Sequence, residues 1–434
     1  MTPAERAAVA ALDEEGLVAF LRELVAIPSV DGEETVAQQR VASWLRDEGL
    51  AADVWDIDLH EVAAHPDFSC EVERDAALGV VGWIGPETKG DGGRDLLLDG
   101  HIDVVPAGEP TSWTVDPWRG ALRDGRVYGR GACDMKGGLC AALFAAKSLH
   151  DARVPLRGRV LVASVVGEED GGLGTLATLL RGHSADGAIV TEPTNLRTVT
   201  AGAGSLMFRL TVQGRAAHGS VRAEGVSAIE KFVPLFAAIR SLEAERNTGG
   251  GGELYAAHRL PWPIEVGTLR AGEWASSVPE RLVCEGRYGF APGEDEAAAR
   301  RAFESAIAAA AEADPWLREH PPLVEWWGGR FAPALTDPED PLVTTLAGAA
   351  GAVLGSAAPP EGVTYGSDMR LLVNVGRMPT VLFGPGDVRD CHMPDESVAV
   401  DELRLAARAL IVAAMRFCGV DEVSGSAPGA GVPS

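Results

Sequence analysis

Short apolar runs alternate with helix-like stretches over the first 200 residues of the chain. Four of these runs have the composition of buried strands: Val80–Ile84, Leu96–Leu98, Val160–Val166 and Ala188–Val190. Between them, Gly138–Leu149 and Leu173–Leu180 have the composition and length of helices. Strands that alternate with helices predict an α/β layer with a largely parallel sheet.

Two amphipathic helices are expected ahead of the first of these strands. Residues 3–25 form one continuous helix in this interpretation, and residues 34–50 form the second. In the second helix, the spacing predicts that Val36, Val41 and Leu45 face the core.

The pattern changes after residue 200. Leu206–Val212 alternates apolar and polar residues, as a strand with one solvated face does. A helix, two strands and a second helix follow: 226–245, 264–269, 281–288 and 294–313. This order predicts a small open-faced α+β sandwich, residues 201–320, inserted into a larger domain.

The larger domain is therefore expected to be discontinuous, with residues 1–200 and 321–434. Its second part contains a helix, a strand and a last helix: Leu342–Leu354, Thr380–Phe383 and Val400–Phe417. Residues 424–434 are rich in Gly, Pro and Ser and are predicted to be disordered. Residues 58–74, with His60 and His65, are predicted to form an additional surface loop.

The charge of the chain limits its partners. Lys and Arg total 38 and Asp and Glu total 63, which gives a net charge of −25. This charge repels phosphate backbones and anionic lipid, so we expect neither nucleic acid nor a membrane surface as a partner. No apolar run reaches the ~18 residues of a membrane span, and the N-terminus lacks the apolar stretch of a secretory signal. The six cysteines form no C-x-x-C pair, so a cytoplasmic location with free thiols is expected.

Polar side chains follow the predicted strands. Leu96–Leu98 leads into His101 and Asp103, whose spacing of two places them on the same side. A carboxylate beside an imidazole can accept its second N–H and fix the tautomer that faces a metal. The alternative interpretation is a surface loop with two polar residues.

Four other segments carry residues of the same chemical types. Asp134 stands among glycines directly before a helix, where a simple helix N-cap is the alternative. Residues 168–170 are three consecutive acids after a strand; they repel one another unless a cation holds them, and a solvated turn is the alternative. Glu192 follows a further strand, and His392 lies in a polar loop after the strand at 380–383.

Together these segments are more informative than any one of them. Strand ends on one edge of a sheet converge in space even when they are distant in sequence. Two histidines and three carboxylates are sufficient to bind two divalent cations, with one carboxylate bridging them. A dinucleotide-binding enzyme and a serine hydrolase are both excluded, because the sequence lacks their G-x-G-x-x-G and G-x-S-x-G motifs.

The same segments resemble a known family. Five motifs carry the resemblance, in the family's order: Gly100–Pro106, Gly129–Gly138, Glu168–Glu169, Thr191–Thr194 and His392–Glu396. They are similar to those of the di-zinc aminoacylase and carboxypeptidase G family, which includes acetylornithine deacetylase, succinyl-diaminopimelate desuccinylase and peptidase T. The resemblance implies a zinc-peptidase-like catalytic domain, with a central mixed sheet flanked by helices. It also implies an inserted α+β lid through which two chains form a homodimer.

The resemblance assigns roles residue by residue. It implies two Zn²⁺ ions, with Co²⁺ or Mn²⁺ as possible substitutes, and five metal ligands: His101, Asp134, Glu169, Glu192 and His392. Asp134 would bridge the ions, with a cis peptide bond directly after it, and Asp103 would orient His101. Glu168 would be the general base, and His218 of the lid would stabilise the oxyanion, often from the partner subunit.

The resemblance also bears on the substrate. Glu192 stands where aminopeptidases of the family have Asp, which favours an N-acyl amino acid and a deacylase. A dipeptidase or carboxypeptidase remains the alternative, and an inactive scaffold is disfavoured because all the expected positions are filled. Four residues are expected to contact substrate: Arg287, Arg370, Gly366 and Ser277. Ser277 stands where the family usually has Asn, and the arginine that recognises a succinyl group is absent near Ala203–Ser205, so desuccinylation is not expected.

Overall fold

The computed structural model describes residues 1–421. The stretch 424–434, predicted to be disordered, lies outside these residues. None of the helices in the described part of the chain combines the length and apolar character that crossing a bilayer requires.

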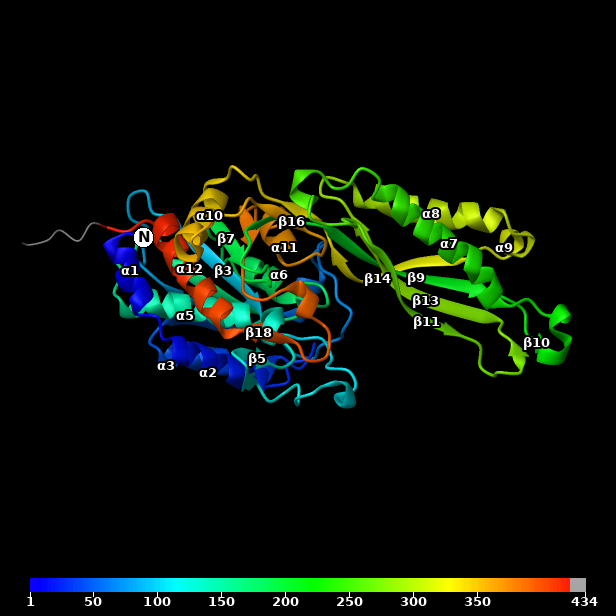
Figure 1. The fold of residues 1–434 in the computed structure, drawn as a ribbon, viewed down its shortest axis with the longest axis horizontal. Helices are drawn as coiled ribbons and strands as arrows, with labels where there is room; N and C mark the ends of the chain where they lie inside the picture. The colour runs from blue at the N-terminus through cyan, green and yellow to red at the C-terminus, as the bar shows by residue number, and fades with distance from the viewer. Residues whose placement is uncertain (422–434) are drawn as a thin grey trace, which may run out of the picture.

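A nine-stranded mixed sheet forms the centre of the larger lobe (Figure 1). Its strands are, in spatial order, β1 (Ala51–Asp56), β2 (Leu78–Ile84), β6 (Val160–Val165), β3 (Leu96–His101), β7 (Gly187–Val190), β17 (Thr380–Leu382), β8 (Val199–Gly202) and β15 (Ala334–Leu335), with β16 (Glu361–Val363) also paired to β8. The central strands β6, β3, β7 and β17 are parallel, whereas β1, β2 and β15 pair antiparallel at the two sides. The α/β class and the mixed sheet are confirmed.

Helices cover this sheet, and the side chains of the strands divide between two cores. The helices of the larger lobe are α1 (Pro3–Ala10), α2 (Glu14–Val25), α3 (Thr35–Asp47), α4 (Leu59–Ala63), α5 (Gly137–Asp151), α6 (Leu173–Leu180), α10 (Pro341–Leu354), α11 (Met369–Asn374) and α12 (Val400–Cys418). Leu96 and Leu98 of β3 pack into the core that contains α5 and α12, whereas Leu97 packs into the opposite core with Met369 of α11. This alternation explains why the strand is apolar at every position.

Two details of the predicted N-terminal helices are wrong. The stretch 3–25 is two helices, because the Asp13 carboxylate accepts the Gly16 N–H at 2.8 Å and caps a new helix. In α3, Val36 is 61% exposed. The buried position belongs instead to Gln38, whose amide donates to the carbonyl oxygens of Leu78 and Ser164.

The smaller lobe is a four-stranded antiparallel sheet with two long helices on one face. Its strands run in the order β11 (Ile264–Ala271), β13 (Arg281–Phe290), β9 (Gly204–Gln213) and β14 (Leu323–Phe331), and its helices are α7 (Ala228–Arg246) and α8 (Glu296–Glu312). Phe208, Tyr288 and Phe303 are at the centre of its separate core. The fourth strand, β14, follows residue 320, so this sheet uses more of the chain than the expected insertion.

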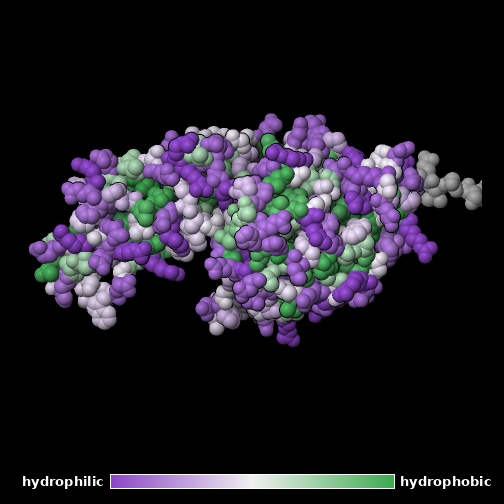
Figure 2. Space-filling view, turned by 180° about the vertical axis from the view of Figure 1, so that it is seen from behind, coloured by the Kyte–Doolittle hydropathy of each residue, from purple (hydrophilic) through white to green (hydrophobic). Residues whose placement is uncertain are grey.

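The two lobes lie end to end. In Figure 1 the smaller lobe extends away from the larger one, and the short strand β10 (Ala217–His218) lies at its far end. The space-filling view from behind shows a hollow in the outline between the lobes (Figure 2). A third sheet of three short strands joins two segments of the larger lobe: β4 (Ala121–Arg123), β5 (Arg126–Tyr128) and β18 (Ser397–Ala399).

Candidate active site

Three neighbouring parallel strands deliver polar side chains to one edge of the large sheet. Strand β3 ends at His101, β6 is followed by Glu168 and Glu169, and β7 is followed by Glu192. Because β3 pairs in parallel with both β6 and β7, their carboxyl ends lie at the same edge. The predicted convergence of these side chains therefore follows from the topology.

Two other segments complete the group. Asp134 lies in the turn between β5 and α5, and the expected cis peptide bond between it and Met135 is present. The backbone N–H groups of Cys133 and Asp134 donate to the Glu396 carboxylate at 3.0 and 3.1 Å. Since β18 pairs with β5, the loop that carries His392 is held against this turn.

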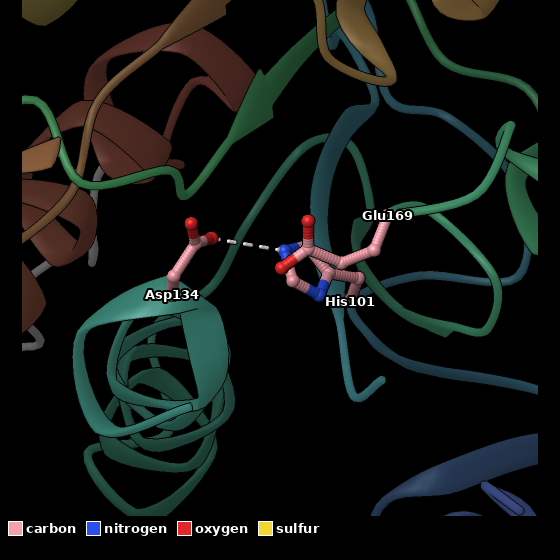
Figure 3. Close-up of side chains that lie close together, drawn as sticks. All are labelled: His101, Asp134 and Glu169. Atoms are coloured by element: carbon pink, nitrogen blue, oxygen red, sulfur yellow. Dashed lines mark hydrogen bonds and ion pairs between the residues drawn. The ribbon is translucent and has the colours of Figure 1, made fainter. Parts of the chain in front are cut away.

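The side chains of these segments meet around Asp134. His101 Nε2 is 3.2 Å from one Asp134 oxygen, and His392 Nε2 is 3.4 Å from the other. His392 Nε2 is also 3.0 Å from Glu169 Oε1. Figure 3 shows the Asp134 carboxylate and Glu169 both directed towards the ring of His101. One carboxylate thus lies between two imidazoles, as a bridging ligand requires.

Two sets of donor atoms are close enough to hold a cation. His101, Asp134 and Glu169 offer ligand atoms within 4.8 Å of one another, and so do His101, Glu168 and Glu192. Nitrogen and carboxylate oxygen are the donors that Zn²⁺ accepts. The residues present therefore fit two divalent ions. Glu168 is itself close enough to the second set of donor atoms to bind a metal ion.

The electrostatics of the cluster favour a cation. Burial raises the pKa values of Glu168, Glu169 and Glu192, and neighbouring carboxylates raise them further. Burial alone would lower the pKa of His392, but hydrogen bonds to Asp134 and Glu169 raise it to about 11. Without metal the cluster thus retains protons, and a divalent ion competes with those protons for the same lone pairs.

Asp103 and Glu168 are both buried beside these residues. His101 Nδ1 is 3.0 Å from the main-chain carbonyl oxygen of Asp103 and 3.7 Å from its carboxylate. The Asp103 carboxylate accepts the Glu169 N–H at 3.0 Å. Glu168 is 6% exposed, and its Oε1 has no hydrogen-bond partner within residues 1–421. A buried acceptor without a donor is suited to taking a proton.

The structure does not bring every predicted site residue to this cluster. His218 and Ser277 are exposed and pair with each other across β10 and β12 (Ser277–Val278), in the smaller lobe. The His218 ring contacts Ser220 Oγ at 2.7 Å. Within one chain, β10 lies at the far end of the smaller lobe, away from the large sheet (Figure 1).

The two predicted arginines differ in their surroundings. Arg287 donates to Ser205 Oγ and to the carbonyl oxygen of Thr364, each at 3.2 Å, and is half-buried. Arg370 is buried, donates to the carbonyl oxygen of Gly171 and lies over the ring of Phe331. Arg370 therefore donates this hydrogen bond inside the protein, to the residue that directly follows the acidic turn 168–170.

A cleft of about 160 Å³ opens onto the cluster, and some of the residues that line it were not predicted from the sequence. Its lining includes Asp134, Glu168, Glu169, Glu192, Gly366 and His392, together with Tyr365 and Cys391. Cys391 Sγ lies 3.6 Å from Cys133 Sγ. The sequence offers one signal for Tyr365 as a residue of the cleft: it directly precedes Gly366, which was expected to contact substrate.

A buried arginine behind the acidic turn was also missed. Arg74 belongs to the segment expected to be a surface loop, yet its side chain is 1% exposed. It donates to Asp170 at 2.8 Å and to Glu34 at 2.9 Å. Asp170 also accepts the Val72 N–H at 2.9 Å. This part of the segment therefore fixes the turn that carries Glu168 and Glu169.

Comparisons with known proteins agree with this site. Residues 97–416 match the family described as peptidase family M20/M25/M40. The chain is 29% identical to N-formyl-4-amino-5-aminomethyl-2-methylpyrimidine deformylase of Halalkalibacterium halodurans, over 94% of this chain and 95% of that protein. It is 31% identical to acetylornithine deacetylase of Myxococcus xanthus, over 76% and 82%.

The fold is shared with solved structures of low sequence identity. Human carnosine dipeptidase 1 superposes with a TM-score of 0.75 at 16% identity, covering 96% of this chain and 99% of that chain. Since the family match spans well over half of the residues, and the site carries the ligand types that the motifs predict, the chain belongs to peptidase family M20/M25/M40 and is a metal-dependent hydrolase of amide bonds.

Proposed function

We propose that this enzyme hydrolyses the amide bond of a small N-acyl amino acid. The observation that carries the proposal is the convergence of two imidazoles and three carboxylates, with Asp134 between the imidazoles, beside a cleft of about 160 Å³. A cleft of this size accommodates a small acyl group rather than a folded polypeptide.

Five residues would hold the two ions, which we propose to be zinc: His101, Asp134, Glu169, Glu192 and His392. When bound, the ions supply a Lewis acid for the amide carbonyl and favour deprotonation of water at neutral pH. Asp103 fixes the backbone of Glu169 and contacts the His101 ring through its carbonyl oxygen.

Glu168 is the general base of this proposal. It takes a proton from the attacking water and later delivers that proton to the nitrogen of the leaving amine. Its burial, and the lack of a hydrogen-bond partner for its Oε1 within the described part of the chain, support this role. The neighbouring Glu192 carboxylate raises its pKa, whereas cations in the cluster would lower it.

The remaining predictions concern assembly. Because His218 is exposed at the far end of the smaller lobe, any contact it makes with substrate would have to follow a large movement or come from a second copy of the chain. We propose the second arrangement, a homodimer formed through the smaller lobe. The cytoplasmic location stays a prediction.

A second candidate substrate is an N-formyl amine without a carboxylate. Two observations favour it. The match with the Halalkalibacterium halodurans relative covers 95% of that protein, which is named as a deformylase of an N-formyl aminopyrimidine. In addition, Arg370 is buried and donates its hydrogen bond to a main-chain carbonyl oxygen. Of the two predicted anchors for a substrate carboxylate, only Arg287 is partly exposed.

A hydrolysis screen separates these candidates. The zinc- or cobalt-loaded enzyme is assayed with N-acetyl, N-formyl, N-succinyl and N-carbamoyl amino acids, an N-formyl aminopyrimidine and simple dipeptides. N-acyl amino acids should give the highest kcat/KM, and replacing their carboxylate by an amide should raise KM. Faster hydrolysis of the N-formyl aminopyrimidine would favour the second candidate, and hydrolysis of dipeptides alone would refute both.

A further inference from the structure

Tyr365 lies in the wall of the active-site cleft, in the connection between β16 and α11. It lines the same cleft as Asp134, Glu192 and His392. None of the roles assigned above uses this side chain. It is also the only tyrosine among the residues that line this cleft in the described chain.

The two ends of the Tyr365 side chain differ in exposure. The residue as a whole is half-buried, but its hydroxyl oxygen is buried and has no hydrogen-bond partner among residues 1–421. The hydroxyl is thus the inner end of the side chain, and the Glu192 and Asp134 carboxylates are close enough to oppose ionisation of the phenol. A buried hydroxyl without a hydrogen-bond partner destabilises the folded protein. A ligand that brings an acceptor to this hydroxyl would offset that unfavourable free energy.

We propose that the Tyr365 hydroxyl donates a hydrogen bond to the carbonyl oxygen of the scissile amide and to the oxyanion that this oxygen becomes. The inference rests on the proposed amide hydrolysis. A phenol with an ordinary pKa of about 10 is protonated at neutral pH and is an available donor. Its proton stays on the tyrosine oxygen throughout, and no bond of the side chain breaks.

The chemistry of the cleft supports a donor at this place. The other named groups around it are mainly carboxylates, which cannot stabilise a negative oxygen without a cation. His218, the residue expected to stabilise the oxyanion, lies far away in the same chain. Tyr365 therefore supplies a neutral donor from within the chain, and the tightening of its hydrogen bond as charge develops would lower the barrier.

The test compares Tyr365→Phe with Tyr288→Phe. Tyr288 is the matched control, because its hydroxyl is buried too, in the core of the smaller lobe. In the zinc-loaded enzyme, Tyr365→Phe should lower kcat by roughly 10²–10³-fold, as for other lost oxyanion donors, with little change in KM. Metal content and melting temperature should match those of the wild type, and Tyr288→Phe should keep wild-type kcat.

Two results would overturn the inference. A kcat for Tyr365→Phe within about twofold of the wild type would show that the hydroxyl does not contact the reacting oxygen. Loss of zinc from the variant would show that Tyr365 orients Glu192 instead.

A second readout separates this inference from the proposed function. Binding of inorganic phosphate, a tetrahedral anion, is measured by calorimetry on the zinc-loaded proteins. We expect at least about tenfold weaker binding to Tyr365→Phe, as for the loss of one hydrogen bond to a charged group. If the wild type hydrolyses none of the amides, the proposed function fails, while the phosphate comparison still decides whether Tyr365 is a donor in the cleft. Equal phosphate affinity in that case, or no binding to either protein, would overturn the inference.

Discussion

The adjacent carboxylates Glu168 and Glu169 should respond in opposite ways to the same chemical change. Glu168→Gln preserves the size of the side chain and removes its basicity. We expect kcat to fall by about 10²–10⁴-fold, which corresponds to roughly 3–5 kcal/mol in the activation free energy. Zinc content and substrate affinity should stay close to those of the wild type.

The structure indicates that the Glu168→Gln protein will fold. Glu168 is buried, and its pKa is raised by burial and by the Glu192 carboxylate, so the charged form destabilises the metal-free protein. A neutral glutamine removes this repulsion. The melting temperature of the metal-free variant should therefore equal or exceed that of the wild type at neutral pH.

Glu169→Gln is the matched variant. Glu169 contacts His392 Nε2 at 3.0 Å and shares a set of potential ligand atoms with His101 and Asp134. Replacing one of its charged oxygens by an amide nitrogen should lower metal content from about two ions per chain towards one.

The assay is elemental analysis and steady-state kinetics on the two variants side by side. The experiment discriminates between the two glutamates, because a Glu168 oxygen also lies within 4.8 Å of potential ligand atoms of His101 and Glu192. If Glu168→Gln loses zinc while Glu169→Gln only slows turnover, the two roles are exchanged. If neither variant changes metal content or kcat, the acidic turn is not the active site.

Three other predictions follow from the site and its surroundings. The reconstituted protein should contain about two zinc ions per chain, and a chelator should abolish an activity that Zn²⁺ or Co²⁺ restores; intact activity without metal would refute the site. Burial, Asp103 and Asp170 raise the pKa of Asp31 in the folded protein to about 9, whereas its ordinary pKa of 3.8 applies to the unfolded chain. The free energy of unfolding therefore decreases as the pH rises from 3.8 towards 9. Asp31→Asn should therefore raise the melting temperature more near pH 9 than near pH 4, and an equal shift at both would contradict this. If His218 acts in the partner's site, mixing inactive His218→Ala and Glu168→Gln chains should regain activity, because each mixed dimer has one complete site; no recovery in proven mixed dimers would refute it.

The central strands and the metal-binding segments could be predicted because each has a local signal. Leu96–Leu98 is apolar at every position since both faces of its strand are covered. Because the strand itself is apolar, the polar residues His101 and Asp103 that follow it are easily recognised in the sequence. Parallel pairing then brings the ends of neighbouring strands together without further information.

Features that depend on distant partners could not be predicted. Gln38 is buried because its amide meets backbone groups of β2 and β6, which no helical periodicity shows, and Val36 was assigned to the core in its place. Strand β14 was missed because glycines interrupt it where its register shifts, between Trp327 and Arg330. Arg74 has the sequence context of a loop, and its burial depends on three acids far from it in the chain.

The order of the strands has a consequence for how the protein is made. The ribosome has synthesised β8 before any of β15, β16 and β17, and the whole contiguous sheet of the smaller lobe is synthesised between them. Helix α12, whose inner residues include Leu403 and Leu410, is the last element of the described residues to be synthesised, and it covers the main core. The smaller lobe can therefore complete its sheet on the nascent chain while the larger one still exposes apolar surface. We expect this interval to be the period in which the growing chain depends most on chaperones and aggregates most readily.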